Sequence, residues 1–320
     1  YSMFQYKQSV ICFTLTAPWK GYHYGITKFG NEAGYARGIV YNEIILERLG
    51  MNNVWDYVEN GTWTWEVFLN IAKQATQDLN GDGIIDQWGL CTRTIEDLAT
   101  LLVYSNGGSI VEEAGDTFRY TLNSQKSIKA LQFMSDLYNV HQVITNDRDW
   151  LNDLKNGKAA FAVFPLGSYS GTFLTEPDIA SKIFIAPMAK GPDADNYISG
   201  YATQYSMYVF PSYLRDAKEV ITAVAEMFHS AYIANKEEYS PVRSGAESWF
   251  KNNLDNVDKF LRLRELAGPF LKTRVGLFGT LSSQINNEVF LKVYKREVPV
   301  TSALSASESV MQSIIDDVLN

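Results

Sequence analysis

The stretch DRDWLNDLKNGKAAFAVF, residues 147–164, contains one helix-to-strand transition. Residues 147–156 predict a short helix, and Gly157 suits the end of that helix because glycine adopts the left-handed conformation without a steric cost. The β-rich run Ala159–Phe164 follows at once and predicts a strand. The same alternation recurs along the chain, which indicates an α/β fold with mainly parallel sheets.

Other segments extend this alternation on both sides. Helices are predicted after Thr64 and after Ser124, because a hydroxyl side chain suits the N-cap and apolar residues follow at helical spacing. Apolar stripes also predict helices at 216–234 and at the end of the chain. Further strands are predicted at 22–27, 38–41, 182–186 and 205–210. The length of 320 residues is enough for about two domains of ~150 residues each.

Composition and charge exclude several classes of protein. With 46% hydrophobic and 20% charged residues, the chain is an ordinary globular protein rather than a disordered or membrane-embedded one. The net charge of −8 argues against nucleic acid as a partner, since phosphate binding needs an excess of basic groups. Two cysteines and three scattered histidines provide neither a disulfide scaffold nor a zinc cluster. The glycines form no nucleotide-binding pattern, so we expect no required cofactor.

The letters Gly167-Ser168-Tyr169-Ser170-Gly171 match the GxSxG nucleophile elbow of α/β-hydrolases. In that motif Ser168 would lie on a tight turn between a strand and a helix and would need a histidine as its base. Pro177 interrupts the following helix early, and His229 is the one histidine downstream. A serine hydrolase that uses Ser168 therefore stays as an alternative to a polar turn after the strand.

The loop DLNGDGIIDQ, residues 78–87, has oxygen-bearing side chains at alternate positions, as calcium loops do. The candidate ligands of a structural calcium ion are Asp78, Asn80, Asp82, Ile84 through its carbonyl, Asp86 and Gln87. Gly89 occupies the position at which an EF-hand has its bidentate glutamate. Completing the coordination shell of a calcium ion would therefore need Gln87, water or a distant carboxylate. A plain Asp/Asn/Gly turn between a helix and a strand explains the same residues, and both interpretations stay open.

Six segments in sequence order carry a resemblance to a known family. They are VYNE at 40–43, NGTWTWEVF at 60–68, DLNGDGIIDQWGL at 78–90, NGG at 106–108, NGKAAF at 156–161 and APMAKGP at 186–192. Together they resemble the family 1 extracellular solute-binding proteins of bacterial carbohydrate ABC transporters. The resemblance implies a two-lobed, periplasmic-binding-protein-like fold of type II with hinge crossings, in which the first lobe lacks its N-terminal part.

The resemblance also implies a domain layout. Residues 1–38 and 201–240 would form the partial lobe one and residues 39–200 lobe two, while the helices of 241–320 would pack mainly on lobe two.

Its functional implication is a binding protein rather than an enzyme. The protein would capture a carbohydrate, expected to be an oligosaccharide, in the cleft between the lobes and deliver it to the membrane permease. We expect a monomer outside the cell, either periplasmic or held at the surface as a lipoprotein, with the signal segment absent from this chain. A structural or adhesive surface module without a small ligand is a third interpretation.

Ligand contacts carry over from the family position by position. The implied contacts are Asn31, Tyr35, Asn106, Phe164, Ser168, Tyr169, Tyr201, Gln204 and Phe278. Aromatic rings and hydroxyl or amide side chains suit sugars, which offer both C–H faces and hydroxyls. Ser282 and Ser283 stand where relatives often place an aromatic residue, which argues against sugar stacking at that corner. Trp63 and Trp65 are assigned to core packing.

Overall fold

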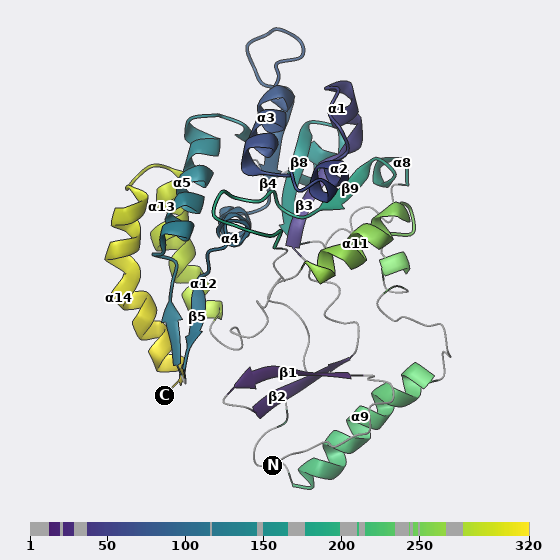
Figure 1. Cartoon of the computed structure of the whole chain (residues 1–320), viewed down its shortest axis with the longest axis vertical. Helices are drawn as coiled ribbons and strands as arrows, with labels where there is room; N and C mark the ends of the chain where they lie inside the picture. Colours follow the sequence, from purple (N-terminus) through teal and green to yellow (C-terminus); the bar gives the residue numbers. More distant parts are fainter. Residues whose placement is uncertain are drawn as a thin grey trace.

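The computed structural model describes residues 13–19, 22–28, 37–115, 117–145, 150–165, 177–198, 210, 215–233, 243, 246–248, 250–266 and 278–319. A five-stranded sheet lies at the centre of these residues (Figure 1). Its strands, from one edge to the other, are β7 (Ile144–Thr145), β4 (Trp88–Thr92), β8 (Ala159–Pro165), β3 (Arg37–Asn42) and β9 (Ile183–Ala186).

The directions of the strands confirm the α/β prediction with one difference. β4 is parallel to both β7 and β8, whereas β3 pairs antiparallel with both β8 and β9. Within this sheet β3 therefore runs against the other strands. The predicted strands at 38–41, 159–164 and 182–186 are confirmed as β3, β8 and β9, and the strand predicted at 205–210 lies outside the described residues except for Phe210.

Helices cover the sheet and connect its strands. Those before residue 200 are α1 (Glu43–Arg48), α2 (Val54–Glu59), α3 (Trp65–Ala75), α4 (Ile95–Ser105), α5 (Gln125–Asn139), α6 (Trp150–Lys155) and α8 (Pro177–Ala180). The Thr64 hydroxyl accepts the Val67 N–H at the start of α3, and the Ser124 hydroxyl accepts the Ser127 N–H at the start of α5. Both predicted N-caps are thus confirmed, as is the end of α6 before Gly157, where φ is +69°.

The core between helices and sheet is aromatic. Trp63, Phe68 and Phe161 are fully buried, with ring centroids 5.1 to 6.1 Å apart. The Trp63 indole N–H donates to the carbonyl of Pro187 at 3.0 Å, and the Trp65 ring stacks on Phe133 at 4.4 Å. Large aromatic side chains dominate the energetics of such cores, so both tryptophans pack as predicted.

The C-terminal helices pack against this body. They are α11 (Asp255–Glu265), α12 (Phe278–Ile285), the π-helix η3 (Asn286–Phe290), α13 (Leu291–Tyr294) and α14 (Val300–Leu319). α11 protects the outer edge of β9, because the Asn256 side chain accepts the Ile185 N–H and donates to the Ile183 carbonyl. α13 contacts α5. β5 (Val111–Ala114) and β6 (Thr117–Tyr120) form a hairpin, and α14 contacts its second strand, β6.

A further hairpin lies apart from the central sheet in Figure 1. It consists of β1 (Phe13–Trp19) and β2 (Tyr22–Lys28), which pair antiparallel, and α9 (Ala217–Ile233) contacts β1. The strand predicted at 22–27 and the helix predicted at 216–234 are confirmed here. The loop of residues 78–87 follows α3, and we call it the acidic loop. It projects from the end of the molecule opposite the β1–β2 hairpin (Figure 1). The division into two lobes, with its boundaries, stays a prediction.

Candidate functional site

The carboxyl ends of β4, β7, β8 and β9 lie at one edge of the sheet, where β3 begins. In open α/β sheets, ligands bind outside this edge. We call the segment Thr92–Asp97, together with Phe164 near the end of β8 and Gly38 near the start of β3, the carboxyl edge. Phe164 and Gly38 are paired across β8 and β3.

Arg93 is the main charged group of the carboxyl edge. Its backbone N–H extends the ladder to the Val163 carbonyl at 3.4 Å, and its Nε and Nη2 both lie 3.3 Å from Oδ2 of Asp97. The Arg93 side chain is 45% exposed, whereas the Asp97 side chain is 5% exposed. The buried carboxylate therefore holds the guanidinium in one orientation and leaves its remaining donors at the surface.

The start of α4 supplies hydrogen-bond partners for the buried Asp97. The Thr94 hydroxyl accepts the Asp97 N–H at 3.1 Å and donates to the Asp97 carboxylate at 2.9 Å. The N-cap Thr94 and the third helical residue, Asp97, therefore satisfy each other's hydrogen-bonding groups. The positive end of the helix dipole adds to this stabilisation. A polar turn with a partly exposed arginine, fixed by a buried helix, can donate hydrogen bonds to a ligand.

A second polar contact joins the C-terminal helices to the same edge. The Ser282 hydroxyl of α12 donates to the Glu96 carboxylate in the first turn of α4. Phe278, one of the predicted ligand contacts, is the first residue of α12 and precedes Ser282 by one helical turn. The structure thus brings α12 to the carboxyl edge, although Ser282 replaces an aromatic residue of the family pattern.

The structure describes the backbone of two predicted ligand contacts, Phe164 in β8 and Phe278 at the start of α12, and the whole of a third, Asn106. The others, Asn31, Tyr35, Ser168, Tyr169, Tyr201 and Gln204, lie outside the described residues.

Asn106 lies in a buried hydrogen-bond network. Its side chain is fully buried after the last residue of α4, and its Nδ2 donates to the Lys126 carbonyl at 2.8 Å and to the Asp193 carboxylate at 3.1 Å. Its Oδ1 accepts the Asp193 N–H at 3.0 Å. Since the amide is used on both sides and has no exposed surface, Asn106 joins α4 to the 191–193 turn in this structure, and its role as a ligand contact stays a prediction. The nearby Lys129, 2.7 Å from Asp193, holds the pKa of that carboxyl below its usual value.

The acidic loop 78–87 folds on its own carboxylates. Asp78 accepts the N–H groups of Gly81 and Gly83, each at 2.7 Å, and the Gly83 bond makes the largest contribution to lowering the pKa of Asp78. Asp86 accepts the N–H groups of Leu79 and Asn80. These are the hydrogen bonds expected of a plain Asp/Asn/Gly turn, in which the side chains accept from nearby backbone N–H groups.

The side chain of Gln87, one of three ways to complete the predicted calcium coordination, is bound elsewhere in this structure. Its side chain is fully buried, accepts from Arg48 and donates to the Ala75 carbonyl at 2.6 Å, so it is committed to the body of the protein. Among the residues that the structure describes, no three His, Cys, Asp or Glu side chains are grouped to hold a metal ion. Calcium binding through Asp78, Asn80, Asp82, Ile84 and Asp86 stays a prediction.

Sequence reasoning missed Arg93 and Glu96, and it singled out Ser282 only as the replacement of an aromatic residue. A signal for the first two was present: Thr94 followed three residues later by Asp97 forms an N-capping pattern, directly before the apolar run of α4. It would have located a helix start at 94–97 and hence a strand end just before it. No comparable local signal pointed to Ser282, whose partner is 186 residues away.

Comparison with known proteins places the chain among binding proteins. Residues 13–227 match the model of the family described as bacterial extracellular solute-binding protein. The arabinooligosaccharide-binding protein of Halalkalibacterium halodurans is 26% identical over 181 residues, which are 52% of this chain and 35% of that protein. The match thus spans about a third of this curated relative.

Solved structures show the same fold. The maltose/maltodextrin-binding domain MalE from Bdellovibrio bacteriovorus, bound to maltotriose, has a TM-score of 0.65 at 17% identity over 95% of this chain and 76% of that one. The GacH receptor of Streptomyces glaucescens, studied unliganded and with acarbose, has a TM-score of 0.66 at 14% identity over 94% and 73%. The predicted α/β periplasmic-binding-protein fold of type II is therefore confirmed. Among the described helices, none combines the length and apolar character needed to cross a membrane.

Proposed function

Because the chain belongs to the family of bacterial extracellular solute-binding proteins, we propose that it binds an oligosaccharide and delivers it to the permease of an ABC transporter. Members of this family are receptors and not enzymes, which removes the catalytic interpretation of Ser168 in the GxSxG letters. The sugar class is supported by the name of the curated relative, an arabinooligosaccharide-binding protein, and by the maltotriose and acarbose of the structural neighbours.

The observation that carries the proposal is the arrangement at the carboxyl edge. Sugar hydroxyls bind where oriented donors and acceptors line a site. Arg93 is held by the buried Asp97, so its free N–H groups are oriented before a ligand arrives, and little side-chain entropy remains to be lost. Glu96 and Ser282 add polar atoms beside it.

The mechanism that follows is hinge closure. A ligand that contacts both lobes favours the closed state by the difference between its affinities for the closed and open states. On this proposal the protein acts as a monomer outside the cytoplasmic membrane, in the periplasm or attached to the cell surface by a lipid, and needs no cofactor.

Isothermal titration of the chain with arabinotriose, maltotriose and laminaribiose tests the proposal, with a dipeptide as the competing class of ligand. We expect one of the sugars to bind and Arg93→Ala to weaken that binding by about tenfold or more, the effect of a lost charged hydrogen bond. Arg262→Ala is the matched control, because Arg262 is 47% exposed and is paired with Glu59 at 2.7 Å on another face.

Two results would contradict the proposal. One is binding of the dipeptide without binding of any sugar. The other is binding of no ligand at all, which would favour the structural or adhesive module. Equal loss in the Arg93→Ala and Arg262→Ala variants would show that the carboxyl edge is not the site.

A further inference from the structure

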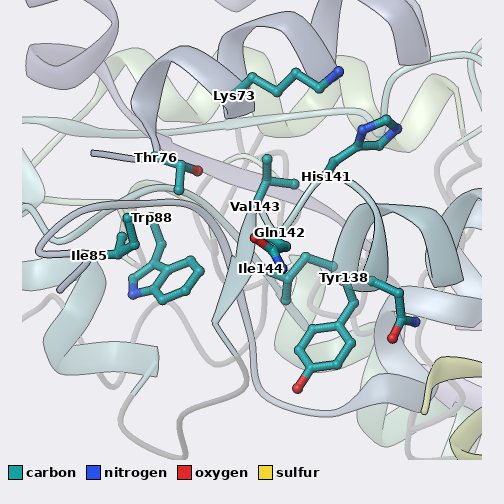
Figure 2. Close-up of a pocket in the computed structure, with 10 residues that line it drawn as sticks. Lys73, Thr76, Ile85, Trp88, Tyr138, His141, Gln142, Val143 and Ile144 are labelled. Carbon is teal, nitrogen blue, oxygen red and sulfur yellow. The ribbon is translucent and has the colours of Figure 1, made fainter. Parts of the chain in front are cut away.

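A pocket, drawn in Figure 2, is lined by residues at the edge of the central sheet opposite the carboxyl edge. It has a volume of about 610 Å³ and opens where β4 and β7 begin, between the ends of α3 and α5. Ligand pockets for small molecules have volumes of roughly 300 to 1,000 Å³. Because strands β4 and β7 run away from it, this pocket is separated from the carboxyl edge by the length of the sheet.

Aromatic rings form one part of the wall. Trp88 and Tyr138 both line the pocket, and Figure 2 shows their rings on either side of Ile144. Tyr138 is 38% exposed, yet its ring is stacked on Tyr294 with centroids 4.3 Å apart and planes inclined by 27°. Stacking on the buried Tyr294 fixes the Tyr138 ring, so a partly open aromatic face is available before any ligand binds.

Polar groups line the same pocket. His141 and Gln142 follow the end of α5, and Lys73 comes from the last turn of α3 (Figure 2). Gln142 has a φ of +51°, a backbone conformation that is uncommon for residues other than glycine and is found at functional sites. Burial lowers the pKa of His141, so its ring is neutral at pH 7 and offers one donor and one acceptor.

We propose that this pocket is an accessory saccharide site that accepts one or two neutral sugar rings. The aromatic faces of Trp88 and Tyr138 suit the C–H faces of a sugar, and the imidazole, amide and ammonium groups suit its hydroxyls. A single cation, Lys73, beside an acidic loop is a poor site for a phosphorylated ligand. The inference does not rest on the proposed function, because none of the residues that line the pocket belongs to the carboxyl edge.

The test uses the whole chain and saturation-transfer NMR with isothermal titration of arabinotriose, maltotriose and laminaribiose up to millimolar concentrations. We expect Tyr138→Ala to weaken binding at the accessory site about tenfold, and Gln142→Ala about fivefold. Val140→Ala is the matched control, since Val140 is 54% exposed in the same turn and does not line the pocket. Circular dichroism checks the fold, and Gln142→Ala decides the matter if Tyr138→Ala fails to fold.

The outcomes separate this site from the carboxyl edge. Two sites in the unmodified chain, one weakened by Tyr138→Ala and the other by Arg93→Ala, support both proposals. One site that is weakened by Tyr138→Ala and not by Arg93→Ala supports the accessory site and shows that the carboxyl edge is not the sugar site. Sugar binding that neither Tyr138→Ala nor Gln142→Ala changes, binding that Val140→Ala weakens equally, or the absence of any sugar binding overturns the accessory site.

Discussion

Asn106→Ala tests the structural role of a side chain that the family resemblance assigned to ligand binding. The substitution removes three hydrogen bonds of 2.8 to 3.1 Å and leaves the Lys126 carbonyl and the Asp193 N–H without the amide that satisfied them. A buried hydrogen bond contributes about 1 kcal/mol, and an unsatisfied buried group costs about 1–3 kcal/mol. Asp193 is partly exposed, so water replaces some of the loss. We expect the free energy of unfolding to fall by about 3 kcal/mol.

Urea denaturation followed by circular dichroism measures this change. Asn60→Ala is the control, because the Asn60 amide also donates one hydrogen bond, to the Asp56 carbonyl at 2.8 Å, but does so at the surface. We expect the control to change stability by less than about 1 kcal/mol. An Asn106→Ala variant that is as stable as the control, but binds sugar more weakly, would refute the structural role and restore the ligand contact.

A double-mutant cycle with Gly191 sharpens the same prediction. A Cβ added at Gly191 would lie 2.2 Å from Oδ1 of Asn106, 2.8 Å from its Cγ and 2.9 Å from its Cβ. Gly191→Ala therefore displaces the Asn106 amide and breaks the same bonds. In the Asn106→Ala background the two nearest of these contacts are absent. Gly191→Ala should therefore lower the free energy of unfolding by less there, with a coupling free energy of about 1–2 kcal/mol. Strictly additive effects would mean that Asn106 does not fill the space above Gly191.

Three further predictions concern the rest of the described chain. Gly89→Ala should destabilise the fold by about 2 kcal/mol or more in urea denaturation, because the added Cβ would lie 2.3 Å from the Ala72 carbonyl oxygen, and a variant of normal stability would contradict the α3–β4 packing. Burial lowers the pKa of His141 from 6.5, so the stability that the neutral ring contributes is present above pH 6.5 and is lost as the pH falls. His141→Asn should therefore reduce the change of the urea unfolding midpoint between about pH 7 and 5. A variant whose midpoint depends on pH as strongly as that of the unmodified chain would refute this. Because the Asp78 carboxylate is already satisfied by backbone N–H groups, calcium should shift the melting temperature by less than about 2 °C, whereas a larger rise that Asp82→Asn abolishes would establish the calcium loop.

The calcium loop and Asn106 show where motif reasoning stops. Both were identified correctly as polar residues at structured turns, and both chemical roles depended on what else reached those turns. Gln87 has the spacing of a ligand, but Arg48 and Ala75 take its side chain from 39 and 12 residues away. Asn106 has the position of a family contact, but Asp193, 87 residues away, accepts and donates to the same amide.

The sequence by itself determined the features that depend on neighbours along the chain. Hydroxyl caps at Thr64 and Ser124, glycine at 157, apolar runs of strand length and Trp65 at the start of a helical stripe all act within one or two turns, and each formed as predicted. Tertiary structure decided the reversed direction of β3, the orientation of Arg93 on Asp97 and the approach of Ser282 to Glu96. Strand order depends on which segments meet after collapse. Side-chain orientation depends on which distant group satisfies a buried polar atom, and neither has a local signal in the chain.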